Sequence, residues 1–140
     1  MEVKQSITEE DILKCRDAML ALRPHIKPED FAGIVKEMLT EGYQLAYIEE
    51  NGKAAAVIGY RYLHYLYNGK HIYIDDLSTL PEHRGKGYGG MLLDYVEAEA
   101  KSKGYTAVTL DSGHQRFDAH RLYLNKGFKI VSHHFSKVLK

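Results

Sequence analysis

The stretch that decides the fold lies in the second half of the chain, where residues 77–90 read LSTLPEHRGKGYGG. Four glycines fall within six residues, between a strand-like stretch and a segment with helical periodicity. A plain strand-to-helix turn usually needs fewer glycines. The segment therefore predicts a loop that brings backbone N–H groups close to a ligand, at the positive end of a helix that starts near Gly90. Arg84 and Lys86 add charges that suit phosphate oxygens.

Two motifs overlap in this loop. The dinucleotide pattern G-x-G-x-x-G is matched by Gly85, Gly87 and Gly90. A dinucleotide loop, however, follows its strand directly and belongs to a chain of parallel strands, whereas residues 81–84 intervene here and the preceding strands are joined by tight turns. The alternative pattern, Arg-x-x-Gly-x-Gly, is formed by Arg84, Gly87 and Gly89. We favour this second pattern, which describes a nest of N–H groups for a diphosphate.

The first half of the chain is predicted to be helical and then strand-like. Apolar residues at helical spacing, with Thr8 as a capping hydroxyl, predict helices over 12–22 and 28–39. Turn signals at 50–52 and 68–69 separate three strands of an antiparallel meander, 43–48, 54–65 and 71–80. After the glycine loop we expect a helix to about 103, a strand over 107–110, a helix over 118–126 and a final strand from 128. The order predicts a mixed α/β (α+β) fold in a single domain, 1–140.

Composition narrows the partners and the compartment. The 140 residues carry equal numbers of acidic and basic side chains, so the net charge is zero with histidines neutral and we expect neither nucleic acid nor a membrane as partner. The N-terminal stretch has no apolar run that predicts a signal peptide or a membrane helix. Cys15 is the only cysteine, which fits a reducing compartment. A small-molecule partner and a cytoplasmic location are the resulting expectations.

Two segments carry a resemblance to a known family. Residues 77–89 closely resemble the cofactor motif of the GNAT superfamily of acyl-CoA N-acyltransferases, and residues 119–128, AHRLYLNKGF, resemble its Ala-x-x-Phe-Tyr-x-x-x-Gly-Phe segment. Arg116 stands where the family often has an asparagine that contacts the cofactor. The resemblance implies the GNAT fold: two N-terminal helices, an antiparallel meander leading into a strand–helix–strand cofactor unit, and a central mixed sheet flanked by helices. It also implies acetyl-CoA as acyl donor and direct transfer of the acetyl group to an amine.

The resemblance assigns the cofactor and catalytic residues. The residues expected to bind acetyl-CoA are Leu77, Ser78, Thr79, Arg84, Gly85, Lys86, Gly87, Tyr88, Gly89 and Gly90. Tyr123 matches the family's tyrosine near the cofactor sulfur, where its phenol would protonate the leaving thiolate. Asp75 matches an acidic position proposed as the base in polyamine-type members.

The acceptor end of the site is predicted from the neighbours of Asp75. A period of two sends the side chains of Asp75 and Asp76 to opposite faces of the sheet, unless a bulge changes the alternation. We expect Asp76, Tyr62 and His25 to line the acceptor site, because a carboxylate and aromatic faces suit a cationic amine. The acceptor is thus predicted to be the primary amine of a small molecule.

The sequence also bears on a metal site, on alternative functions and on the assembly. The histidines near Asp111 fit no standard metal spacing, so no metal is expected. The alternatives to a small-molecule enzyme are a catalytically silent CoA-sensing or partner-binding module and an acetyltransferase for protein lysines or N-termini. The resemblance to this fold also implies that a homodimer is one expected assembly.

Overall fold

A computed structural model of the chain describes residues 2–139, which fall into two compact units, Met1–Leu110 and Asp111–Lys140. The first unit contains a five-stranded sheet in the order β1-β2-β3-β4-β5. Its strands are β1 (Val3–Gln5), β2 (Tyr43–Glu50), β3 (Lys53–Tyr65), β4 (Gly69–Thr79) and β5 (Ala107–Leu110). All neighbouring strands are antiparallel except β4 and β5, which are parallel. The predicted meander and the mixed sheet are both confirmed, whereas the three-residue β1 was not predicted.

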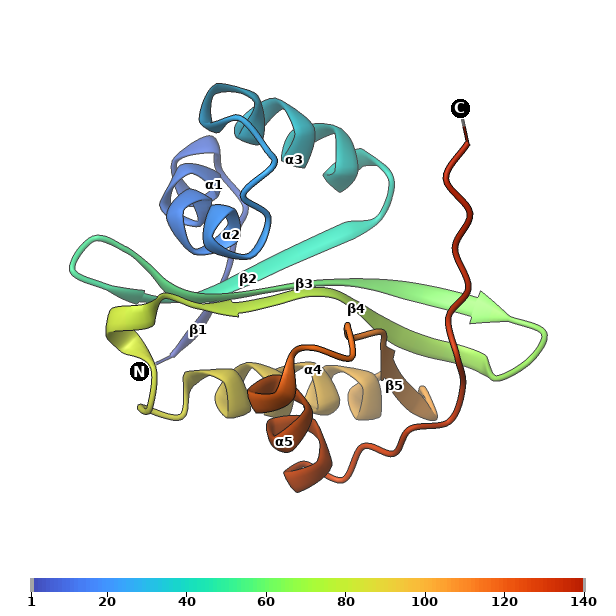
Figure 1. The fold of residues 1–140 in the computed structure, drawn as a ribbon. Coiled ribbons are helices and arrows are strands. Elements are labelled where there is room, and N and C mark those ends of the chain that lie inside the picture. Colours follow the sequence, from blue (N-terminus) through green and yellow to red (C-terminus); the bar gives the residue numbers. More distant parts are fainter. Residues whose placement is uncertain (1, 140) are drawn as a thin grey trace. The chain divides into compact units, whose positions relative to one another are not determined.

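Helices cover both faces of this sheet. The helices α1 (Glu9–Lys14), α2 (Arg16–Leu22) and α3 (Phe31–Thr40) lie on one face, and α4 (Tyr88–Ser102) lies on the other (Figure 1). Side chains from α3 and β2, among them Phe31, Val35, Tyr43 and Leu45, are almost fully buried in the core between the first three helices and the sheet. The central mixed sheet flanked by helices is therefore as predicted.

The first predicted helix is divided in two. Residues 12–22 were expected to form one helix, but α1 ends before Cys15 and α2 begins after it. The Cys15 N–H donates to the carbonyl of Ile12, three residues back, and so tightens the end of α1. Because the Cys15 side chain is fully buried, the break places this residue in the core between the helices and the sheet.

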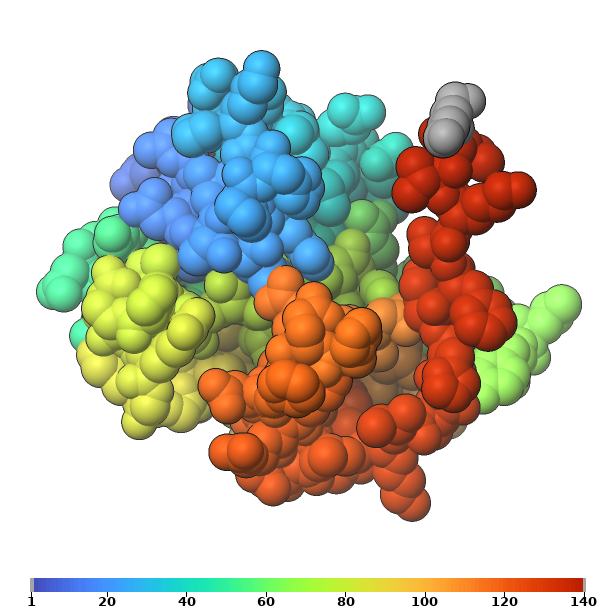
Figure 2. All heavy atoms as spheres, viewed as in Figure 1, coloured from blue at the N-terminus to red at the C-terminus, as the bar shows by residue number. Residues whose placement is uncertain are grey.

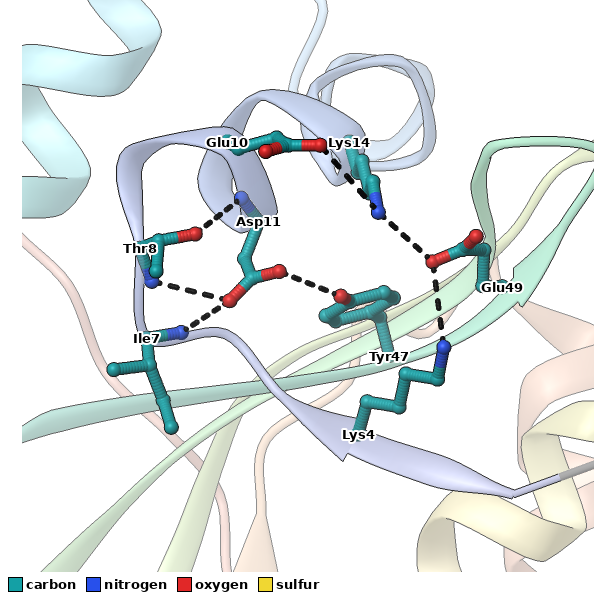
Figure 3. Close-up of polar contacts among 8 residues, drawn as sticks. All are labelled: Lys4, Ile7, Thr8, Glu10, Asp11, Lys14, Tyr47 and Glu49. Carbon is teal, nitrogen blue, oxygen red and sulfur yellow. Dashed lines mark hydrogen bonds and ion pairs between the residues drawn. The ribbon is translucent and has the colours of Figure 1, made fainter.

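Polar contacts at the start of α1 fix the helix against β2 (Figure 3). Thr8 and Asp11 form a reciprocal capping box, which confirms Thr8 as the cap. The Asp11 carboxylate accepts hydrogen bonds from the backbone N–H groups of Ile7 and Thr8 and from the Tyr47 hydroxyl. These bonds, of which that from Ile7 is the strongest influence, lower the pKa of Asp11 to about 2. Asp11 thus stays ionised near neutral pH and joins α1 to the sheet.

The second unit contains one helix, α5 (Phe117–Asn125), which agrees with the predicted 118–126 within one residue. Gly127, at φ 90°, follows the helix, and the Phe128 N–H donates to the Tyr123 carbonyl at its C-terminus. The predicted final strand is wrong: the described residues 126–139 form neither helix nor strand. The apolar side chains after Phe128, among them Ile130 and Phe135, are exposed, so the segment lacks the burial of a core strand. Within residues 2–139, no helix has the length and apolarity needed to cross a membrane.

Candidate functional site

The glycine loop joins the end of β4 to the start of α4. A single 3₁₀ turn, Pro81–His83, follows β4, and the chain then passes through residues 84–87. Gly85 and Gly87 have φ angles of 81° and 82°, in the left-handed region that favours glycine. Gly87 is the N-cap of α4, so the helix begins at Tyr88 rather than at the predicted Gly90.

The start of α4 has the features of an anion site. The first N–H groups of a helix have no partner within the helix and lie at the positive end of its dipole. No side chain caps them here, because Gly87 has none to offer. A Cβ placed on Gly85 or Gly87 would have no atom within 4 Å, so the space beside both glycines is open. Figure 2 shows this yellow-green segment at the surface of the molecule, where a ligand has access to it.

Glu50, at the end of β2, holds the loop from the side. Its carboxylate accepts hydrogen bonds from Lys86 Nζ at 3.1 and 3.2 Å and from the Tyr88 hydroxyl at 2.6 Å, and it lies 3.1 Å from His83 Nδ1. The hydrogen bond from Tyr88, and then that from Lys86, lower the pKa of Glu50. Lys86 was expected to face phosphate oxygens, but here it pairs with Glu50. Sequence reasoning missed Glu50, because no local pattern links it to a loop more than thirty residues away.

The edge of β4 that faces away from β3 has no neighbouring strand after Ile74 in the described sheet. β5 pairs with residues 71–74 only, whereas β3 stays paired with β4 as far as Thr79. The residues along this edge include Leu77, Ser78 and Thr79, which were predicted to bind the cofactor arm. An edge strand offers backbone N–H and C=O groups to an extended ligand, as it would to another strand.

A bulge in β4 places the two neighbouring aspartates in one network. Gly59 of β3 pairs with Asp76, while Tyr60 pairs with Ile74, so Asp75 is the extra residue. The bulge thus changes the alternation that a regular strand would impose on the two side chains. Asp76 accepts hydrogen bonds from Arg23 Nε at 3.0 Å and from the Tyr43 hydroxyl at 2.7 Å.

Asp75 enters the same network through two arginines. Its Oδ2 accepts a hydrogen bond from Arg61 Nε at 2.8 Å, and the Arg61 guanidinium lies over the ring of Tyr43. Its backbone carbonyl accepts one from Arg23 Nη2 at 2.9 Å. Its Oδ1 is buried and has no hydrogen-bond partner among the described residues. Burial raises the pKa of Asp75 and outweighs the opposing effect of Arg61. Asp75 thus has one carboxylate oxygen without a hydrogen-bond partner among the described residues, and its carboxylate binds a proton more readily than that of an ordinary aspartate.

Gly59 is required opposite this network. A Cβ at Gly59 would overlap the hydroxyl and ring of Tyr43. The missing side chain lets the Tyr43 hydroxyl cross the sheet surface to Asp76. Burial, followed by the charge of Asp76, raises the pKa of Tyr43 well above its usual value, so the phenol stays protonated and remains a donor to Asp76.

A cavity of about 200 Å³ lies beside Asp76 and is lined by residues of α2, of α3 and of the segment between them. His25, one of the residues predicted for the acceptor site, lines this cavity. Tyr62 does not, because its hydroxyl donates to Glu99 of α4 and its ring packs edge-on against Tyr105. The structure therefore brings His25 and Asp76 together but leaves Tyr62 against the helix that covers the opposite face of the sheet.

Tyr123 belongs to the second unit, on α5. Its ring packs at 5.9 Å from the ring of Phe128. Burial raises the pKa of Tyr123, while Arg116 opposes the shift. The phenol is therefore protonated near neutral pH and is able to donate a proton. Among residues 2–139, no group of three or more His, Cys, Asp or Glu side chains is placed to hold a metal ion.

The structure thus combines a mixed sheet with a strand that carries a carboxylate pair and leads into a glycine loop at the start of a helix. Residues 12–128 match the acetyltransferase (GNAT) family, and the chain belongs to that family. It is an N-acetyltransferase by this membership and by its relatives.

Two relatives and one solved structure illustrate the similarity. The uncharacterized N-acetyltransferase YhdJ of Bacillus subtilis is 36% identical over 139 residues, which are 98% of each chain. The aminoalkylphosphonate N-acetyltransferase of Salmonella typhimurium is 35% identical over 98 residues, which are 69% of this chain and 62% of that enzyme. The aminoglycoside N-acetyltransferase AAC(6')-Iy, solved in complex with CoA, matches with a TM-score of 0.85 at 14% identity, covering 99% of this chain and 94% of that one.

Proposed function

We propose that this chain transfers an acetyl group from acetyl-CoA directly to the primary amine of a small molecule. One observation carries the proposal: β4 has an edge without a neighbouring strand, bears the carboxylate pair, and leads into the glycine loop. The base, the edge for the pantetheine arm and the loop for the diphosphate thus follow one another along β4 and the segment after it. One relative and one solved structure of the same fold support a small amine, since their names specify aminoalkylphosphonate and aminoglycoside acceptors.

The donor end is assigned to the loop and the strand edge. The N–H groups at Gly85, Gly87 and the start of α4 would bind the diphosphate, and Arg84 would add charge. The edge formed by residues 77–79 would hold the pantetheine arm through its backbone groups. The whole span 1–140 would then act as one catalytic domain, which the family match over 12–128 supports. The single Cys15 supports a cytoplasmic location.

The chemistry needs a base for the amine and an acid for the thiolate. The amine nitrogen attacks the thioester carbon, a C–N bond forms, and the C–S bond breaks. Asp75 takes the proton that the amine nitrogen loses, directly or through water, on its carboxylate, whose pKa is raised by burial. Tyr123 gives its phenolic proton to the departing thiolate and regains one from solvent. Asp76, already bound to Arg23 and Tyr43, would attract the ammonium form of the acceptor.

Thiol release tests the proposal. Purified protein with acetyl-CoA and a panel of primary amines should release CoA thiol only when an amine is present, with one acetyl-amine formed for each thiol. Binding of CoA without turnover on any amine would contradict the proposal and favour the silent sensing module. Turnover on peptides alone would favour a protein acetyltransferase.

Tyr123→Phe tests the acid. We expect kcat to fall by about 100-fold, within the range for one general acid, while the KM for acetyl-CoA stays within about twofold. Steady-state kinetics at saturating amine measure both. Tyr65→Phe is the matched control, because Tyr65 is half-exposed in the β3–β4 hairpin and should show normal turnover. Equal kcat in the two variants would make Tyr123 a packing residue.

Glu50→Gln tests the side support of the glycine loop. Loss of the charge that holds Lys86 should loosen the loop and raise the KM for acetyl-CoA by about 10-fold without changing kcat. Acetyl-pantetheine has no diphosphate, so its kcat/KM should not change. Glu49→Gln is the control, since the neighbouring Glu49 pairs with Lys4 and Lys14 instead. An equal effect on both donors would show that Glu50 acts on the fold rather than on the diphosphate site.

A further inference from the structure

The cavity beside Asp76 is mostly apolar. Ten residues line it, of which six have aliphatic, thioether or phenyl side chains: Met19, Ile26, Phe31, Ile34, Val35 and Met38. These six come from α2, α3 and the segment between them. They form a wall with no charged group of its own, and the two methionines let the wall adapt to different shapes.

Three of the four polar residues that line the cavity, Arg23, Tyr43 and Asp76, are already paired. Among the described residues that line it, Arg23 is the only lysine or arginine, and its Nε and Nη2 donate to Asp76 and to the Asp75 carbonyl. The Tyr43 hydroxyl is also committed to Asp76. The cavity therefore offers an incoming anion no uncommitted guanidinium, and the Asp76 carboxylate, itself paired with Arg23, is the only acidic group among the described residues that line it.

The volume limits what the apolar part can hold. A cavity of about 150 Å³ lined by aliphatic and aromatic side chains takes a benzene ring, and this cavity is about 200 Å³. A sugar or a phosphonate placed there would lose hydrogen bonds to water and face Ile34 and Met38 instead, which costs about 1–3 kcal/mol for each unpaired polar group. An apolar group would gain by the same burial.

We propose that the acceptor is a primary amine that carries an apolar group about the size of a phenyl ring, held in this cavity with the nitrogen toward Asp76. The inference rests on the proposed acetyl transfer and names the acceptor class for it. It separates this chain from the aminoalkylphosphonate relative and from the aminoglycoside enzyme of the same fold.

A matched set of amines tests the proposal. At saturating acetyl-CoA, 2-phenylethylamine should have a kcat/KM at least about 10-fold above those of ethylamine, 2-aminoethylphosphonate and neamine, because burial of the ring adds binding that the others lack. A preference for the phosphonate or for neamine would overturn the apolar class while leaving acetyl transfer intact. Absence of turnover with every amine, although CoA binds, would instead refute the proposed function on which the inference rests.

A substitution in the cavity wall locates the effect. Ile34 is 40% exposed, so Ile34→Gln should fold, but its amide would enter the apolar wall. The kcat/KM for 2-phenylethylamine should fall by about 10-fold, with the values for ethylamine and the affinity for CoA unchanged. Leu13→Gln is the matched control, because Leu13 is 44% exposed on α1 and does not line the cavity. Equal losses in both variants, or a loss that extends to ethylamine, would overturn the assignment of the ring to this cavity.

Discussion

Gly87→Val is expected to abolish acetyl-CoA binding, with the dissociation constant of CoA raised by more than about 100-fold. Two effects combine at this residue. Its φ of 82° is unfavourable for a β-branched side chain, which shifts the backbone at the N-cap of α4. The valine would also project into the open space beside the loop, where the diphosphate is proposed to lie. Isothermal titration with CoA measures the loss.

Gly104→Val is the matched control for this prediction. Gly104 follows the other end of α4, has a φ of 73°, and likewise leaves open space, with no atom within 4 Å of where a Cβ would lie. Both substitutions should therefore cost about 1–2 kcal/mol of folding stability through backbone strain, which thermal unfolding records. Only Gly87→Val should lose CoA. Normal CoA affinity in Gly87→Val, or equal loss in both variants, would refute the assignment of the loop.

Asp75→Asn is expected to lower kcat/KM for the amine by about 100-fold, because the amide cannot accept the proton. The pH profile carries the sharper signature. Burial raises the pKa of Asp75, so its carboxylate becomes protonated as the pH falls through a value above that of an ordinary aspartate. The rate should therefore decrease toward acid pH in the parent protein, and the Asp75-dependent part of this decrease should be missing in Asp75→Asn.

Asp76→Asn separates the roles of the two carboxylates. Asp76 accepts hydrogen bonds from Arg23 and Tyr43, and is proposed to attract the acceptor rather than to take its proton. This variant should raise the KM for the amine and keep the acid limb of the profile. If Asp75→Asn keeps both its turnover and the decrease in rate toward acid pH, Asp75 is not the base. If either variant changes the affinity for CoA, the substituted aspartate acts on the donor site rather than on the acceptor.

The glycine loop and the meander were predictable because their signals are local. Gly85 and Gly87 lie at the two left-handed positions of the loop, and turn residues at 50–52 and 68–69 mark the hairpins. The position of Asp75 was not, because its bulge depends on the pairing of β3 with β4. The side chain of Glu50 likewise reaches the loop only after β2 has joined the sheet.

Two predictions, the unbroken first helix and the final strand, were wrong because both depend on packing between segments that are distant in the sequence. At the break, Cys15 is buried in the core with residues of both short helices, and a periodic apolar pattern does not record such packing. The strand predicted over 128–131 contains β-type residues, but β propensity needs a neighbouring strand and burial to take effect. Residues 126–139 show neither strand structure nor buried apolar side chains.

The close approach of the Tyr43 side chain to Gly59 limits how these two positions can vary among related sequences. Since even a methyl group there would collide with Tyr43, Gly59 cannot change while Tyr43 is present. A larger residue at 59 becomes acceptable only after Tyr43 is replaced by a shorter one, and that replacement removes the hydroxyl bound to Asp76. The two positions should therefore co-vary, and lineages that exchange them should be those in which the acceptor preference has also shifted.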